Sequence, residues 1–114
     1  MNIQIFGKSK CFDTKKAERF FKERGIRFQS VDTVRFGLSK GELRSVCAAC
    51  GGIDALVSDK AQDAVILRYL ASAEAKEEKL LENPAWLRTP IVRNGKAATV
   101  GYRPEVWEQW IKQG

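Results

Sequence analysis

The sequence contains no histidine among its 114 residues. This absence excludes histidine-based acid–base catalysis, Cys–His nucleophile pairs and zinc sites that need a histidine ligand. Only three cysteines are present, no apolar run approaches the ~20 residues that span a bilayer, and the first six residues are too few and too polar for a signal peptide. We therefore expect a cytoplasmic protein with reduced thiols and without a disulfide framework, metal site, bound cofactor or membrane contact.

The remaining composition is that of a compact domain. Hydrophobic residues make up 44% of the chain and charged residues 30%, so we predict a single domain over residues 1–114. The net charge of +6 arises from 20 Lys and Arg against 14 Asp and Glu, which are mixed along the chain. Direct nucleic-acid binding is therefore not expected. Trp107 and Trp110 could stack on bases, but their spacing fits the apolar face of a terminal helix, so we expect them to pack in the core.

The first third of the chain predicts a strand, a helix and a second strand. Residues 2–6 alternate polar and apolar side chains and stop at Gly7. Residues 12–24 carry an apolar helical stripe and are followed by Gly25, and residues 26–34 are rich in branched side chains. This order is a βαβ unit, which implies a parallel pair of strands with a right-handed connection.

The middle third of the chain predicts helices. Ser39 and Glu42 have the spacing of a capping box, which indicates a helix over residues 40–50. Residues 59–70 and 73–81 are rich in Ala, Leu, Glu and Lys and predict one or two further helices.

The last part of the chain predicts a hairpin and a helix. Residues 90–93 and 97–100 are expected strands around an Asn-Gly pair, which is a strong signal for a two-residue turn. Pro104 then begins the last helix, since its fixed φ suits the first helical position. The order βαβ, insertion, ββα predicts a thioredoxin-like α/β fold: a mixed four-stranded sheet with a helical insertion over about residues 39–82.

Cys11 lies directly after the first predicted turn and directly before the first helix. The unpaired backbone N–H groups and the positive end of the helix dipole at that position favour a thiolate over a thiol. Lys8 and Lys15 add positive charge nearby in the sequence. Cys11 is therefore a candidate nucleophile that needs no histidine, and a buried structural cysteine is the alternative interpretation.

Four segments together carry a family resemblance that covers nearly the whole chain. They are residues 11–17 (CFDTKKA), 37–39, 89–92 and 101–104. The first resembles the Cys-Asp-Thr-x-Lys-Lys-Ala type of motif in glutaredoxin-dependent arsenate reductases and Spx-type proteins. The resemblance implies a thioredoxin-like fold, an active-site cysteine at Cys11 and a proline, Pro90, that is usually cis beside the active site.

The same resemblance implies a function and partners. The protein would be a thiol-dependent oxidoreductase with glutathione or a glutaredoxin as reductant, and its substrate would be a small oxyanion or a thiol. The residues expected to bind the anion or substrate beside the Cys11 nucleophile are Lys8, Thr14, Lys15, Thr89, Pro90 and Arg103. The alternative is a non-enzymatic, Spx-like regulator that binds RNA polymerase.

The sequence departs from the arsenate reductase pattern of three oxyanion-binding arginines. Arg103 alone matches that pattern by position, because Thr89 stands before the strand proline and Arg88 one place earlier. A shift of one residue on an extended segment turns a side chain to the opposite face. The insertion arginine is absent, and Lys60 and Arg68 would replace it only after rearrangement. Each lost charge-assisted bond costs about 1.5–3 kcal/mol, so arsenate is not favoured as the natural substrate.

Cys47 and Cys50 form a CxxC pair within the helix predicted after the capping box. Together with Leu43 and Val46 they follow helical spacing, so both sulfurs lie on its apolar stripe. Late in a helix the dipole disfavours a thiolate, the opposite of the situation at Cys11. We interpret the pair as small buried hydrophobic residues; a resolving thiol for Cys11 and, less favourably, a metal ligand are the alternatives.

Overall fold

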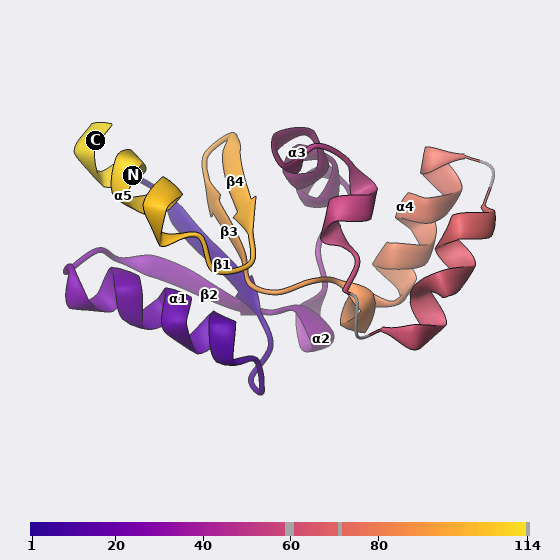
Figure 1. The fold of residues 1–114 in the computed structure, drawn as a ribbon, viewed down its shortest axis with the longest axis horizontal. Helices are drawn as coiled ribbons and strands as arrows, with labels where there is room; N and C mark the ends of the chain where they lie inside the picture. Colours follow the sequence, from indigo (N-terminus) through magenta and orange to yellow (C-terminus); the bar gives the residue numbers. More distant parts are fainter. Residues whose placement is uncertain (59–60, 71, 114) are drawn as a thin grey trace.

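The computed structural model describes residues 1–58, 61–70 and 72–113 and shows a mixed four-stranded sheet. The strands are β1 (Ile3–Gly7), β2 (Phe28–Asp32), β3 (Ile91–Asn94) and β4 (Ala97–Val100). Their order in the sheet is β2-β1-β3-β4, with β2 parallel to β1 and the other neighbours antiparallel (Figure 1). The predicted thioredoxin-like α/β fold is confirmed.

Two helices, α1 (Phe12–Glu23) and α5 (Pro104–Gln113), pack on one face of the sheet. Successive strand residues point to opposite faces, so one alternate set of strand side chains meets these helices. The buried residues of this layer are Ile3, Ile5, Ala17, Phe20, Phe21, Val92 and Trp107. Within it the Trp107 indole N–H donates to the Thr99 hydroxyl at 2.8 Å. Trp110 packs against the same layer, as the spacing of the terminal helix predicts.

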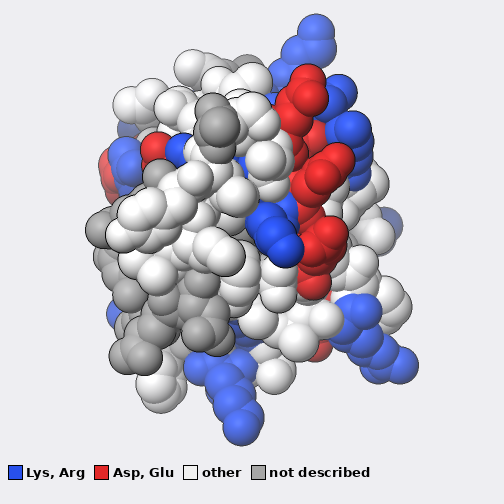
Figure 2. Space-filling model, turned by 90° about the vertical axis from the view of Figure 1, so that its right-hand side faces the viewer, with Lys and Arg blue, Asp and Glu red and all other residues white. Residues whose placement is uncertain are grey.

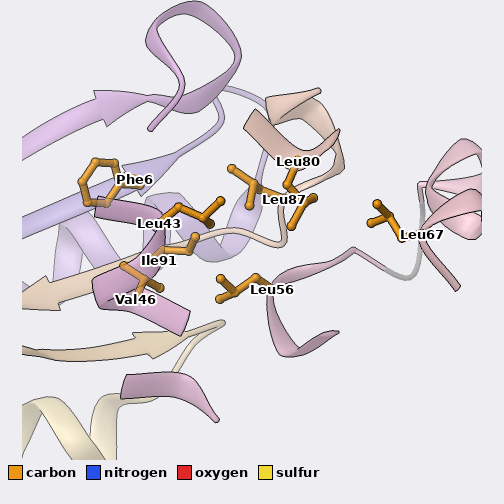
Figure 3. Close-up of a cluster of buried hydrophobic side chains, with 8 residues drawn as sticks. All are labelled: Phe6, Leu43, Val46, Leu56, Leu67, Leu80, Leu87 and Ile91. Atoms are coloured by element: carbon orange, nitrogen blue, oxygen red, sulfur yellow. The ribbon is translucent and has the colours of Figure 1, made fainter. Parts of the chain in front are cut away.

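The other alternate set of strand side chains packs against the long segment between β2 and β3. Its elements are α2 (Thr33–Phe36), α3 (Lys40–Cys50), the 3₁₀ helices η1 (Ile53–Leu56) and η2 (Gln62–Tyr69), α4 (Ala73–Glu82) and η3 (Pro84–Trp86). Eight buried side chains form this second layer (Figure 3): Phe6, Leu43, Val46, Leu56, Leu67, Leu80, Leu87 and Ile91. The neighbours Ile5 and Phe6 therefore anchor the two layers on opposite faces of β1.

The second strand is shorter than the sequence predicts. The prediction is a strand over residues 26–34, whereas β2 spans Phe28–Asp32. The Asp32 carboxylate accepts hydrogen bonds from Val34 N at 3.0 Å and from Arg35 N at 3.3 Å. A side chain that caps backbone N–H groups in this way begins a helix, so the chain turns into α2 instead of extending β2.

The capped helix of the insertion agrees with the sequence prediction. Ser39 Oγ accepts from Glu42 N at 3.1 Å, and Glu42 Oε1 accepts from Ser39 N at 2.8 Å, which completes the capping box of α3. In the helix predicted over residues 59–70, residues 59 and 60 lie outside the described residues, and Gln62–Tyr69 form a 3₁₀ helix instead of an α-helix. Over the part of the chain that the structure describes, no helix is long and apolar enough to span a membrane.

Charged side chains of both signs lie on part of the end of the molecule that carries α4. Figure 2 looks onto this end and shows a band of acidic side chains flanked by basic ones. Arg44 of α3 pairs with Glu77 of α4 at 3.1 Å, and Lys79 pairs with Glu82 at 3.6 Å. The Arg44–Glu77 pair thus links the two longest helices of the insertion.

Candidate active site

Cys11 is the N-cap residue of α1, at the end of the turn that follows β1. Its backbone is extended, with φ −89° and ψ 117°, and its N–H donates to Lys8 O at 3.1 Å. The first N–H groups of α1, which have no intrahelical partners, therefore start beside this residue. The thiol is free and half-buried, so reagents in solvent can reach it.

The segment that precedes β3 lies against Cys11. Thr89–Pro90 is a cis peptide bond, as the family resemblance implies. The Thr89 carbonyl accepts from the Cys11 thiol with a sulfur–oxygen distance of 3.6 Å, and Pro90 O accepts from Gly101 N at 2.8 Å. The fold thus brings together Cys11 and Thr89, two predicted site residues that are 78 positions apart in the sequence.

Burial raises the pKa of the Cys11 thiol, but hydrogen bonds to the thiolate outweigh burial and hold the pKa below its ordinary value. The donors are the hydroxyls of Thr14 and Thr89 and the backbone N–H groups of Thr14 and Asp13. The Thr89 carbonyl acts in the opposite direction, because it can pair only with the protonated sulfur. Several hydrogen-bond donors around a half-buried sulfur can stabilise a thiolate without the help of a histidine.

Thr14 fits tightly against the end of β1. Its side chain is buried, and its Oγ1 accepts from Lys8 N at 3.4 Å. A Cβ on Gly7 would lie 2.2 Å from Thr14 Cγ2 and 2.7 Å from Thr14 Oγ1, so only glycine allows the threonine this position. From the sequence Gly7 is expected only as a strand end, and no local pattern indicates this second role.

Lys8 bridges the turn after β1 and the segment that leads to the cis proline. Its Nζ donates to Ala85 O at 2.8 Å and to Leu87 O at 2.9 Å. Burial lowers the pKa of Lys8, and the charge of Cys11 partly offsets this effect. The anion-binding role predicted for Lys8 stays a prediction; the contacts of its ammonium group in this structure are with backbone carbonyls.

The two other predicted cations of the site differ in their surroundings. Lys15 is exposed on the first turn of α1, and its backbone N–H donates to Cys11 O at 3.3 Å. Arg103 Nε donates to Glu105 Oε1 at 2.6 Å, and this bond holds the pKa of Glu105 below its ordinary value. Arg103 also lines a cavity of about 470 Å³ together with Arg88. Its predicted contact with an anion at Cys11 stays a prediction.

Cys47 and Cys50 are free, half-buried thiols that pack against the insertion core. Burial raises the pKa of both, Glu77 raises that of Cys47 further, and Arg103 partly offsets the rise at Cys50. These shifts are opposite in sign to the shift at Cys11. Packing as small hydrophobic residues is therefore consistent with their environment.

The remaining candidates from the sequence are two cations and a metal site. Lys60 lies outside the described residues, as does the side chain of Arg68. Among the described residues, no cluster of at least three His, Cys, Asp or Glu side chains is arranged to hold a metal ion.

A mixed sheet of this topology, with a free cysteine before the first helix and a cis proline against it, is the arrangement of thioredoxin-like proteins. The chain belongs to the ArsC family, whose model matches residues 6–110. The family predicted from the sequence is thereby confirmed.

Individual relatives support the same family. The chain is 30% identical to the global transcriptional regulator Spx 2 of Oceanobacillus iheyensis, over 96% of this chain and 93% of that protein. Its fold resembles that of an arsenate reductase from Vibrio cholerae, with a TM-score of 0.83, 22% identity, and 96% and 97% of the two chains covered. It also resembles an arsenate reductase (ArsC) related protein from Brucella melitensis, with a TM-score of 0.63, 21% identity, and 98% and 96% covered.

Proposed function

We propose that the protein is a thiol-dependent oxidoreductase in which the Cys11 thiolate is the nucleophile. The observation that carries this proposal is the set of donors around the sulfur: the hydroxyls of Thr14 and Thr89 and two backbone N–H groups at the start of α1. These contacts stabilise negative charge at the place where thioredoxin-like proteins carry their reactive cysteine. The reaction that we propose requires no bound cofactor.

The reaction has two steps of thiol–disulfide exchange. The Cys11 thiolate attacks one sulfur of an oxidised thiol substrate, a new S–S bond forms, and the second sulfur leaves as a thiolate with the electron pair of the broken bond. A reducing thiol, from glutathione or a glutaredoxin, then attacks the mixed disulfide and releases the Cys11 thiolate. Thr89 is half-buried and its carbonyl oxygen lies 3.6 Å from the sulfur, so its backbone would align the substrate there.

The surroundings of the sulfur favour a sulfur substrate over an oxyanion. Arg103 is paired with Glu105, and Lys8 is bonded to two backbone carbonyls. An oxyanion at Cys11 would have to compete with two backbone carbonyls for Lys8 and with Glu105 for the Nε of Arg103. Lys15, which is exposed one turn into α1, remains available to attract an anionic substrate.

An external thiol is favoured as the resolving group. Cys47 and Cys50 have raised pKa values, so at neutral pH they carry little of the thiolate that exchange requires. Glutathione or a glutaredoxin would therefore regenerate Cys11, and the intramolecular route through Cys47 or Cys50 is the less favoured one.

A second candidate function is regulatory, and the similarity to Spx 2 over almost the whole chain favours it. In that case the domain would bind RNA polymerase, and Cys11 would be a redox sensor. Two exposed aromatic side chains, Phe12 next to Cys11 in the sequence and Phe36 in α2, would suit a protein contact. Binding would then not require the thiolate.

The test is a pH titration of alkylation at all three cysteines, read by peptide mass spectrometry, followed by turnover assays. Because the Cys11 pKa is lowered, its reactivity should reach half of its maximum at a lower pH than that of Cys47 or Cys50. Cys11→Ser should abolish glutathione- or glutaredoxin-dependent reduction of a mixed-disulfide substrate. A Cys11 midpoint at the free-thiol value of ~8.5 or above would refute the enzyme. Binding to RNA polymerase that survives Cys11→Ser, without turnover in the unmodified protein, would establish the regulator.

A further inference from the structure

A cavity separate from the Cys11 contacts lies between the end of α3 and the corner that joins β4 to α5. Its volume is about 470 Å³, and its polar lining includes Cys50, Arg88 and Arg103. α3 lies beside β4 in the fold (Figure 1). Its last residue, Cys50, lines the cavity together with Val100 and Gly101. The proposed function uses neither the cavity nor the Arg88 side chain.

The two arginines line the cavity from different segments of the chain. Nη2 of Arg88 lies 3.6 Å from the place that a Cβ on Gly101 would take, so its side chain rests on the corner that leads to Arg103. Within the described part of the chain, no carboxylate forms an ion pair with Arg88. Arg103 binds Glu105 through Nε, which leaves its terminal nitrogens to face other ligands.

The Cys50 thiol lines this cavity, and the positive charge of Arg103 affects its pKa. The thiol is half-buried and free, and Arg103 is close enough to stabilise its thiolate form against the effect of burial. Guanidinium groups bind carboxylates through paired, charge-assisted hydrogen bonds. The cavity therefore combines a thiol, whose pKa is still raised by burial, with groups that would hold an anionic reagent beside it, so reaction there should be slower than at Cys11.

We propose that this cavity is a second reactive site, at which Arg88 and Arg103 bind small disulfides that carry carboxylates and Cys50 forms a mixed disulfide with them. Cys50 loses its proton to solvent, and its thiolate attacks one sulfur of the bound disulfide. The Cys50–sulfur bond forms, the disulfide bond of the ligand breaks, and the other half leaves as a thiolate with the electron pair. Cys50 is oxidised and the ligand is reduced, so no further oxidant is needed.

Cys47 provides a matched comparison within the same helix. It is also half-buried with a raised pKa, and it lines a different cavity of about 430 Å³. The arginine of that cavity, Arg44, is engaged by both carboxylate oxygens of Glu77 at 3.1 and 3.3 Å. Glu77 would repel an anion, and the acidic band in Figure 2 lies at the same end of the molecule. An anionic disulfide should therefore distinguish the two cysteines.

The experiment compares three disulfides on the full chain: anionic dithiobis(nitrobenzoate), neutral dithiodipyridine and cationic cystamine. Labelling rates at each cysteine are read by peptide mass spectrometry. The ratio of the Cys50 rate to the Cys47 rate should be highest for the anionic reagent and lowest for cystamine. The anionic preference should also fall as salt is added, because exposed charges are screened within about 10 Å at 0.1 M. A ratio that is independent of reagent charge would overturn the proposal.

Charge variants assign the effect to the two arginines. Arg88→Gln and Arg103→Gln should each slow labelling of Cys50 by the anionic reagent about threefold, within the range of exposed ion pairs, and leave the neutral reagent unchanged. Arg27→Gln is the matched control, since Arg27 is exposed and precedes β2 at the opposite edge of the sheet from β4. Equal slowing by all three variants would show a general effect of net charge and would refute the site. The comparison of reagents on the unmodified chain keeps the test valid where a variant fails to fold.

Discussion

The Thr14 hydroxyl offers the most direct test of how the structure stabilises the Cys11 thiolate. Thr14→Val keeps the shape of the buried side chain and removes one hydroxyl donor to the sulfur. A hydrogen bond to a charged group is worth about 1.5 kcal/mol at the lower end of its range. Because Cys11 is only half-buried, solvent screening reduces this to roughly 0.7 kcal/mol. The pKa of Cys11 should therefore rise, and below that pKa the thiolate fraction should fall about threefold.

The assay is the ultraviolet absorbance of the thiolate as a function of pH, in a chain that carries Cys47→Ala and Cys50→Ala. Thr99→Val is the matched control, because it removes the buried hydroxyl that accepts from the Trp107 indole and lies outside the Cys11 contacts. Thr14→Ser, which keeps the hydroxyl, should preserve most of the thiolate. If Thr14→Val leaves the titration unchanged, or if Thr99→Val shifts it equally, hydroxyl donation is not what lowers the pKa.

Two further substitutions test the framework around the sulfur. Gly7→Ala would place a Cβ 2.2 Å from Thr14 Cγ2, so we expect a loss of about 1–3 kcal/mol in the free energy of unfolding, measured with urea. The control is Gly41→Ala, which should not destabilise the protein because the space around Gly41 is open. Lys8→Met removes two hydrogen bonds to the carbonyls before the cis proline and a positive charge near Cys11. Amide exchange over residues 85–88 should therefore accelerate, and the Cys11 pKa should rise. Unchanged exchange relative to Lys10→Met would contradict the bridging role of Lys8.

The elements that follow local rules were predictable from the sequence. The capping box at Ser39 and the Asn-Gly hairpin each depend on a few adjacent residues, and both appear as expected. The end of β2 could not be predicted from strand propensity alone, because helix capping competes with strand extension there. Branched residues continue past Asp32, but the carboxylate of Asp32 caps two N–H groups and starts a helix.

The site shows the same division between local and distant causes. The position of Cys11 before a helix is visible in the sequence, and so is the donor role of the first backbone N–H groups. The bonds from Lys8 to Ala85 and Leu87 join residues 77 and 79 positions apart, and no local pattern encodes them. The same holds for Gly7, because its lack of a Cβ leaves the space that the Thr14 side chain occupies.

The three cysteines show that thiol chemistry in this chain depends on position along a helix and on neighbouring donors. Cys11 precedes the first turn of α1, where N–H groups and hydroxyls point at the sulfur and lower its pKa. Cys47 and Cys50 lie in the last turns of α3, where the free backbone groups are carbonyls and burial raises both pKa values. Cys11 at the start of α1 and the two cysteines at the end of α3 therefore have pKa shifts of opposite sign. On the proposals made above, Cys11 would exchange rapidly, whereas the reaction of Cys50 would depend on an anion bound by Arg88 and Arg103.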